Sequence, residues 1–342
     1  MSAPWLTVAM TTYNARDYLA TALDSVLAQG DGAIEVIAVD DASSDETCEI
    51  LESYRSKLDL KVVVREENTA NWMAGLNEGL RRGRGEYACF LQHDDYWLDG
   101  RLLAARSALT REPEAVMLLH AARFVDRNGS ELGKWNCPLP AGRPLAAEEV
   151  MERLLVQNFV AVQAPIFRRE AALRVGGLDE ALWYSSDWDF WLKLAAEGQT
   201  IYLANALSAY RIHNHSMTWW RTDEQIAEQR RQLEQVLKRH SAALEKRRPI
   251  RPAVRRAARF SIEINTTLAA YAHSPSLKVI VLGAHFLGLG PWGWYSFLHG
   301  SRIVERVGAR LRAGMHRWHK AAHPRLAEAA GETTGGGRVA ID

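Results

Sequence analysis

The chain has 342 residues, 47% of them hydrophobic and 24% charged, which is the composition of an ordinary globular protein with a sizeable core. The formal net charge of +1 hides an asymmetry, because residues 221–342 carry 21 Lys and Arg against 10 Asp and Glu, whereas residues 1–220 carry 21 against 31. The three cysteines are widely spaced and form no CxxC pair, which argues against a disulfide framework or a zinc site and for a reducing compartment.

Strands and helices alternate along the first hundred residues. Short apolar runs predict strands, and apolar residues at helical spacing between them predict helices. This alternation predicts a parallel sheet with helices on both faces. The expected strands cover 6–10, 34–39, 62–64 and 87–91, and the expected helices cover 17–29, 47–58 and 71–82.

Polar clusters follow three of these strands, at 11–14, at Asp40-Asp41 and at Asp94-Asp95. Ligands of such sheets bind beyond the carboxyl ends of the strands, so we expect the clusters to meet at one edge. Adjacent carboxylates repel each other unless a cation neutralises them, and Asp94-Asp95 therefore suggests a divalent metal site, although an Asp-rich turn is the alternative. No GxGxxG follows the first strand, and no GxxxxGK[ST] occurs in the sequence.

The clusters belong to four longer motifs: Thr-Thr-Tyr-Asn at 11–14, Ser-Val-Leu-Ala-Gln at 25–29, Val-Asp-Asp-Ala-Ser-Ser-Asp-Glu-Thr at 39–47, and Gln-His-Asp-Asp at 92–95. In order and spacing they resemble the motifs of family 2 glycosyltransferases with the GT-A fold. The resemblance implies an α/β fold in which a mixed, Rossmann-like sheet is flanked by helices. It also implies inverting transfer of a hexose-type sugar from a nucleotide-diphospho-sugar donor, with Mn²⁺ or Mg²⁺ as cofactor.

The same resemblance implies roles for individual residues of the donor-binding half, residues 1–100. Thr11 and Tyr13 match positions that line the nucleotide base, and Asp41 matches the carboxylate that accepts a hydrogen bond from it. Asp95 matches a direct metal ligand, whereas Asp94 matches a residue near the ribose or a metal-bound water. His93 stands where the family often has a further acid, and Asn77 belongs to a donor-binding element in which Leu76 replaces the usual Arg.

The acceptor-binding half is expected at residues 101–220. Helices are predicted at 101–111 and 147–155, strands at 115–119, 160–167 and 199–203, and a hairpin turn at 126–129. Asp187, at the head of a predicted helix, matches the family's general base, which takes a proton from the acceptor hydroxyl. The alternative is that Asp187 only caps that helix, and Asp189 is expected to have a supporting role.

The segment 210–216, Tyr-Arg-Ile-His-Asn-His-Ser, resembles the family's closing motif. There a His or a basic residue reaches the metal or the diphosphate. His213 is therefore the candidate metal ligand and Arg211 the candidate diphosphate contact. A structural or solvated histidine is the alternative.

Residues 221–330 are expected to form a basic helical C-terminal extension, with helices at 225–243 and 255–271, followed by a disordered tail at 331–342. Residues 279–298 contain no Asp, Glu, Lys or Arg, but glycines and Pro291 interrupt them. We expect 279–312 either to contact a membrane surface through aromatic and basic residues or to pack on the catalytic domain. No secretory signal is apparent at the N-terminus, so the expected location is cytoplasmic, including the inner face of the cell membrane.

Together these features predict an inverting glycosyltransferase that acts on a saccharide or lipid-linked acceptor in surface polysaccharide or glycolipid synthesis. A noncatalytic nucleotide-sugar-binding partner subunit with the same fold is the alternative. A nucleotidyltransferase is a third option, but the expected Gly-rich basic loop after the first strand is missing. Nucleic acid is not an expected partner, since no recognised module accompanies the basic tail.

Overall fold

The first half of the fold is a run of strands joined by helices. In the computed structural model, which describes residues 3–213, 222–270, 276–309 and 311–312, every strand and helix expected in residues 1–100 is present within a few residues. In chain order these are β1 (Leu6–Thr12), α1 (Leu19–Leu27), β2 (Ile34–Asp40), α2 (Thr47–Tyr54), β3 (Leu60–Val64), α3 (Trp72–Arg82) and β4 (Tyr87–Phe90).

The second half contains longer strands than the sequence indicated. Its elements are β5 (Tyr96–Trp97), α4 (Arg101–Arg111), β6 (Ala115–Val125), β7 (Glu131–Trp135), β8 (Pro144–Leu145), α5 (Ala147–Val156), β9 (Ile166–Arg168), α6 (Arg169–Arg174), α7 (Ser186–Glu197) and β10 (Gln199–Arg211). β6 and β7 form the expected hairpin around residues 126–129. The strand expected at 160–167 is wrong over most of its length. A turn from Ala161 to Ala164 occupies that stretch, and Pro165, which cannot donate to a ladder, follows it.

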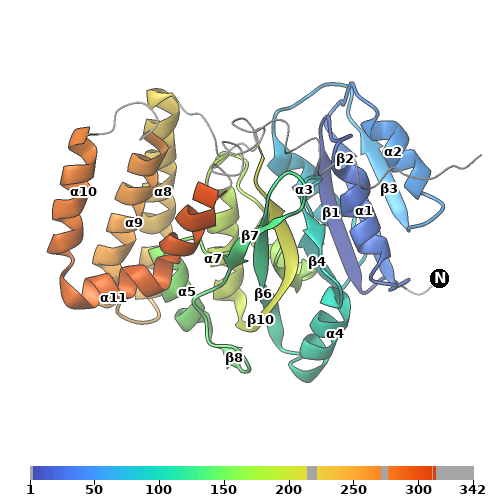
Figure 1. Cartoon of the computed structure of the whole chain (residues 1–342). Coiled ribbons are helices and arrows are strands. Elements are labelled where there is room, and N and C mark those ends of the chain that lie inside the picture. Colours follow the sequence, from blue (N-terminus) through green and yellow to red (C-terminus); the bar gives the residue numbers. More distant parts are fainter. Residues whose placement is uncertain (1–2, 214–221, 271–275, 310, 313–342) are drawn as a thin grey trace, which may run out of the picture.

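These strands form one mixed sheet in the order β3-β2-β1-β4-β9-β6-β10-β5, with β7 beside β6 and β8 beside β10. β1 pairs in parallel with both β2 and β4, and β9 pairs antiparallel with β4 and β6. Figure 1 shows helices on both faces of this sheet. The polar ends of β1, β2 and β4 therefore lie along one edge, as their positions in the sequence predicted.

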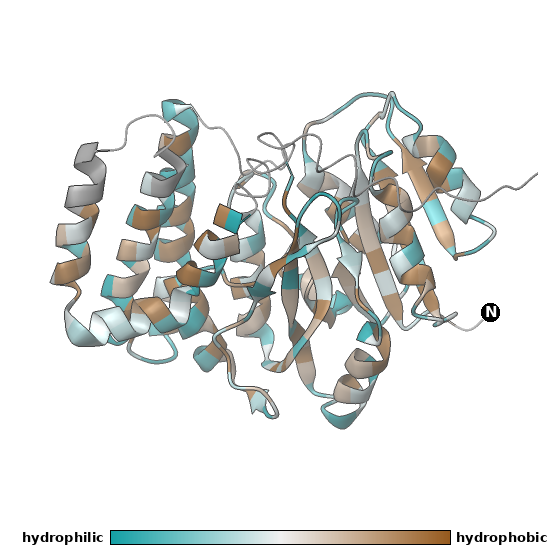
Figure 2. Cartoon of the chain, viewed as in Figure 1, coloured by the Kyte–Doolittle hydropathy of each residue, from teal (hydrophilic) through white to brown (hydrophobic). Residues whose placement is uncertain are grey.

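Two hydrophobic cores lie on the two faces of the sheet. Alternate residues Leu6, Val8 and Met10 of β1 pack in one core with α1, α2 and α4, and Ala9 faces the other core with α3, α5 and α7. Helix α3 lies very close to β1, because a Cβ at Gly79 would meet the Cβ of Ala9 at 2.7 Å. Figure 2 shows the flanking helices with hydrophilic and hydrophobic bands, as expected when one side of a helix is buried.

The C-terminal region forms α8 (Asp223–Glu245), α9 (Pro252–Ala270), α10 (Ser276–Gly288) and α11 (Gly290–Ser301) beside the second half of the fold. Val236 of α8, Phe260 of α9 and Phe297 of α11 belong to the same core as α5 and α7. Packing on the catalytic domain, one of the two predicted alternatives, is therefore observed. No helix in the described ranges is long and apolar enough to cross a membrane, and the expected tail at 331–342 lies outside those ranges.

Candidate active site

A cavity of about 770 Å³ opens at the carboxyl ends of the central strands. Its walls come from the ends of β1 and β2, from the segment after β4, from the start of α7 and from α9. Most of the residues singled out from the sequence therefore share one space. Those that line the cavity are Thr11, Tyr13, Asp41, His93, Asp94, Asp95, Asp187 and His213.

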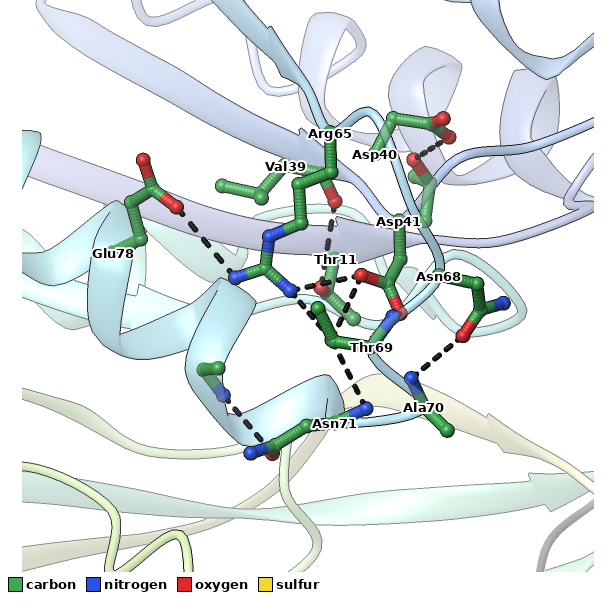
Figure 3. Close-up of polar contacts among 12 residues, drawn as sticks. Thr11, Val39, Asp40, Asp41, Arg65, Asn68, Thr69, Ala70, Asn71 and Glu78 are labelled. Carbon is green, nitrogen blue, oxygen red and sulfur yellow. Dashed lines mark hydrogen bonds and ion pairs between the residues drawn. The ribbon is translucent and has the colours of Figure 1, made fainter.

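Asp41 lines the cavity directly after β2, and neighbouring side chains already hold its carboxylate. Its Oδ1 accepts hydrogen bonds from Arg65 Nη1 at 2.9 Å and from Thr69 Oγ1 at 2.9 Å, and its Oδ2 accepts one from the Thr69 N–H at 3.1 Å. Figure 3 shows the Arg65 guanidinium between Asp41 and Glu78. Burial alone would raise the pKa of Asp41, but these hydrogen bonds and the Arg65 charge lower it below its usual value. Asp41 is thus an ionised hydrogen-bond acceptor that is held in a fixed position.

The neighbouring Asp40 stabilises the loop that follows β2. Its carboxylate accepts hydrogen bonds from Thr12 Oγ1 at 2.7 Å, Ser43 Oγ at 2.6 Å and the Ser43 N–H at 2.8 Å. In Figure 3 it points away from the Asp41 carboxylate. Ala42, between Asp41 and Ser43, has a left-handed φ of 61°, which costs free energy that the hydrogen bonds of Asp40 offset. The two acids of this motif are therefore separated into one that supports the loop and one that faces the cavity.

Asp94 and Asp95 follow β4 and form the acidic centre of the cavity. His213 Nε2 lies 2.9 Å from Asp94 Oδ2, and the Arg211 N–H donates to Asp95 Oδ1 at 2.8 Å. Burial would raise the pKa of Asp94, but the hydrogen bond with His213 and the nearby imidazole charges lower it. Burial and the Asp94 charge raise the pKa of Asp95 well above its usual value. A positive charge placed beside Asp95 would therefore be stabilised.

The acidic pair suits a hard divalent cation. In the described parts of the chain, no group of three or more His, Cys, Asp or Glu side chains is arranged to hold a metal ion. Mg²⁺ and Mn²⁺, however, often take only one or two carboxylates from the protein and complete their shell with substrate phosphates and water. The carboxylates of Asp94 and Asp95, with the imidazole of His213 close by, fit that kind of site.

Arg211 lies behind these acids and outside the cavity lining. Its side chain donates to the backbone carbonyls of Asp94 at 2.8 Å, Arg127 at 3.0 Å and Asp126 at 3.2 Å. Its guanidinium also lies 4.5 Å from the centre of the Tyr18 ring. This arrangement favours a scaffold role for Arg211, and its expected contact with the diphosphate stays a prediction.

Asn77 is similarly engaged within the protein. Its side chain donates to the Leu178 carbonyl at 2.9 Å and to Glu180 at 2.9 Å, and it accepts from the Leu178 N–H at 2.9 Å. It is buried and does not belong to the cavity lining. These bonds attach α3 to the segment before α7, so the geometry favours a structural role over the expected donor contact.

Asp187 lies in the first turn of α7 and faces the cavity. Asn158 Nδ2 donates to its Oδ2 at 2.8 Å, and the Trp188 N–H lies 2.8 Å from its Oδ1. Burial raises the pKa of Asp187 to about 6, although the Asn158 hydrogen bond, the Trp188 N–H and the charge of Arg306 act in the opposite direction. The residue before the helix is Ser185, so Asp187 is not the N-cap that the alternative interpretation proposed.

Some residues of this site were not among those predicted from the sequence. Arg65 follows the third strand, and a basic residue at a strand end could have been noticed there. Asn158 and Arg306 could not, because only the tertiary fold brings them to Asp187. The polar group of Gln157, Ser261 and Asn265, which also lines the cavity, joins two distant parts of the chain in the same way.

The sequence is similar to those of known glycosyltransferases. The family model for glycosyl transferase family 2 matches residues 7–173. An uncharacterised protein of Mycobacterium tuberculosis is 28% identical over 218 residues, which are 62% of this chain and 60% of the relative's length. The putative teichuronic acid biosynthesis glycosyltransferase TuaG of Bacillus subtilis is 28% identical over 227 residues, which are 63% of this chain and 82% of that protein.

Solved structures share the fold. The crystal structure of residues 1–349 of Staphylococcus aureus TarS has a TM-score of 0.61 at 19% identity and covers 92% of this chain and 91% of that one. Its complex with UDP-GlcNAc gives a TM-score of 0.58 at 19% identity, with 92% of both chains covered. The chain thus shares the GT-A fold of these structures, and its residues 7–173 form a domain of glycosyltransferase family 2.

Proposed function

We propose that the protein is a metal-dependent, inverting glycosyltransferase that uses a nucleotide-diphospho-sugar donor. The observation that carries the proposal is that an acidic pair after a strand, Asp94-Asp95, and a separate carboxylate on a helix, Asp187, line one cavity. A displacement at the anomeric carbon needs charge stabilisation on the leaving side and a base on the attacking side. The cavity offers groups for both tasks.

At the donor end, Thr11, Tyr13 and Asp41 would hold the nucleoside. Asp41 is buried and kept ionised by Arg65 and Thr69, so it can accept a hydrogen bond from a base N–H without moving. Asp95, with Asp94 and His213 beside it, would hold the divalent cation. When bound, that cation neutralises negative charge on the diphosphate.

At the acceptor end, Asp187 would act as the general base. Its carboxylate takes the proton of the acceptor hydroxyl while that oxygen forms a bond to the anomeric carbon. The bond between this carbon and the diphosphate oxygen breaks on the opposite face, so the configuration inverts and the nucleoside diphosphate leaves. Asn158, which donates to Asp187 Oδ2 at 2.8 Å, would keep the other carboxylate oxygen directed at the acceptor.

The names of the relatives favour a surface polymer as the setting. TuaG is named for teichuronic acid biosynthesis, and TarS is named as a poly(ribitol-phosphate) β-N-acetylglucosaminyltransferase. We therefore propose that the acceptor is a saccharide or lipid-linked chain of a cell-surface polymer. We place the protein in the cytoplasm or on the inner face of the membrane.

We propose that α11, which packs on the catalytic domain through Phe297, contacts a membrane through its opposite, exposed side. Its side chains Trp292 and Tyr295 are 76% and 60% exposed, and they are of the types that favour the lipid interface. Residues 221–342 also carry an excess of basic over acidic residues, 21 against 10, which suits anionic phospholipid. Flotation with anionic vesicles should lift the full chain but not Trp292→Ser/Tyr295→Ser. Equal flotation would contradict membrane contact through α11.

The function can be tested by incubating the protein with UDP-, GDP-, dTDP- and CDP-sugars and Mn²⁺, with and without surface-polymer acceptors. We expect one donor to release its nucleoside diphosphate, faster with acceptor, and a product of inverted anomeric configuration. Binding of a donor without any turnover of it would favour the noncatalytic partner subunit instead. Retention of configuration would contradict the inverting mechanism.

A further inference from the structure

The C-terminal region contributes a cation to the active-site cavity. After α11 the chain turns at Arg302, which has a left-handed φ of 51°, and residues 303–309 return as a helical segment toward β7. Ala309 packs with Phe124 and Leu132 of the hairpin, and Glu305 accepts hydrogen bonds from Asn136 at 3.3 and 3.4 Å. The returning segment is thus anchored on the catalytic domain.

Arg306 projects from this segment into the cavity wall. Its Nη1 donates to the Asn158 carbonyl at 3.4 Å, and its guanidinium lies 5.5 Å from the centre of the Trp135 ring. Asn158 in turn holds Asp187. Arg306 therefore lies on the side of the cavity where the acceptor hydroxyl must approach the expected base.

Arg306 carries a positive charge in a cavity whose other charged lining residues are mostly acidic. Five aspartates line it, at positions 17, 41, 94, 95 and 187, whereas Arg306 is the only Lys or Arg among the described lining residues. Such a wall repels an anionic acceptor except where a cation offsets the acids. A guanidinium also matches the geometry of phosphate and carboxylate groups, because it can donate two parallel hydrogen bonds to them.

We propose that Arg306 is the specificity-determining residue of an acceptor subsite that binds an anionic group, a phosphate or a carboxylate, next to the sugar or polyol hydroxyl that is glycosylated. Gln157, Ser261 and Asn265, which line the same cavity, supply amide and hydroxyl groups for the neutral part of the acceptor. The acceptor class is therefore an anionic polymer. This inference rests on the proposed glycosyltransferase function.

The test compares wild type with Arg306→Gln and Arg306→Lys, using Arg256→Gln on the exposed side of α9 as a control with the same loss of charge. Three acceptors are used: a phosphodiester-linked polyol oligomer, a uronic acid oligomer and a neutral oligosaccharide. Loss of a hydrogen-bonded charge contact should raise the KM for the preferred anionic acceptor roughly 10- to 100-fold in Arg306→Gln. In Arg306→Lys the KM should rise less, because the positive charge is kept. In Arg256→Gln the KM should stay at the wild-type value.

Two further readouts separate the possible outcomes. Direct titration of the anionic oligomer to Arg306→Gln should show the same loss of affinity as the KM, whereas titration of the neutral oligosaccharide should show no such loss. An equal loss of kcat with all three acceptors would instead show that Arg306 only supports Asp187, and would overturn the anion subsite. If wild type neither binds nor hydrolyses any donor, the proposed function itself fails. If it uses donors but Arg306→Gln behaves as wild type, only the subsite is overturned.

Discussion

Burial raises the pKa of Asp187, whereas hydrogen bonds and a nearby positive charge lower it. The resulting pKa makes the site depend on pH. Burial raises the pKa of its carboxyl to about 6, while Asn158, the Trp188 N–H and the Arg306 charge stabilise the ionised form. At neutral pH the carboxylate is therefore mostly ionised and able to accept a proton. Its raised pKa also makes it a stronger base than an exposed aspartate.

We predict that kcat/KM falls by about tenfold for each pH unit below about 6, because the protonated form of Asp187 cannot act as base. Asp187→Asn should lower kcat by roughly 100-fold to 10,000-fold, leave donor affinity nearly unchanged and remove this acid limb from any remaining activity. Glu170→Gln, at an exposed position of α6, is the control. A loss of donor affinity that matches the loss of kcat would contradict the assignment of the base.

Asp95 should determine whether donor binding requires a metal. Its buried carboxylate lies beside Asp94, and a divalent cation relieves the repulsion between the two charges. In Asp95→Ala we expect donor nucleotide affinity to be weak and equal in Mn²⁺ and EDTA, measured by calorimetry. Asp99→Ala, an exposed acid four residues away, should behave as wild type. If Asp95→Ala still binds the donor only with metal, the ligand is another residue.

Strands with an uninterrupted apolar pattern could be predicted from the sequence. Strand segments that depend on hydrogen bonds from neighbouring strands could not. β1, β2 and β4 are short apolar runs that lead into polar clusters, and their bounds agree with the prediction within two residues. β6 continues past Leu119 to Val125 although His120 and Arg123 interrupt the apolar pattern. The reason is that β10 and β7 supply hydrogen-bond partners on both sides of it, which the local sequence does not reveal.

Helix α3 depends on a close approach to β1 that only small residues allow. A Cβ at Gly79 would lie 2.7 Å from the Cβ of Ala9 and 3.3 Å from its Cα, which is backbone. We predict that Gly79→Ala lowers the free energy of unfolding by about 1–3 kcal/mol, since α3 must move away from the sheet. Urea unfolding would measure this. Gly32→Ala, with nothing within 4 Å of the added Cβ, should have little effect, and equal effects would contradict the packing argument.

At the scale of the whole molecule, a buried charge network joins the catalytic domain to its C-terminal region. Asp189 of α7 is fully buried, and its carboxylate lies 2.8 Å from Lys193 Nζ, 2.8 Å from Arg239 Nη1 and 2.8 Å from His240 Nε2. Arg239 and His240 belong to α8. The expected supporting role of Asp189 is therefore to attach α8 to α7. The local sequence around Asp189 could not have predicted this contact.

Removal of the Asp189 charge should weaken this attachment in a pH-dependent way. Burial opposes ionisation, but hydrogen bonds from His240 and Lys193 lower the pKa of Asp189 from 3.8 to about 2. This difference contributes roughly 2 kcal/mol of stability above pH 4, and the contribution is lost as the pH falls toward 2. We predict that Asp189→Asn is destabilised by at least that amount at pH 7 in urea unfolding, and that the gap to wild type narrows below pH 4. A gap that does not change with pH would contradict this account.

The candidate site was predictable where its residues lie in local motifs and not where the fold assembles it from distant segments. Thr11 lies at the end of β1, and Asp41 and Asp94-Asp95 follow β2 and β4, so the topology places them together at one edge. Arg65, which holds Asp41, and Arg306, which approaches Asp187, depend on tertiary contacts. Arg211 and Asn77 have side chains that could contact a donor, and only the structure reveals that the protein already engages them.

Calorimetric titration of UDP, GDP, dTDP and CDP, each in Mn²⁺, Mg²⁺ or EDTA, would test the nucleotide-sugar site first. The proposed roles of Asp41 in binding the nucleotide base and of Asp94-Asp95 in holding a metal-bound diphosphate predict that one nucleotide binds with metal and loses its affinity in EDTA. The same experiment identifies the nucleotide of the donor. Failure of all four to bind under any of these conditions would contradict the assignment of the cavity as a nucleotide-sugar site.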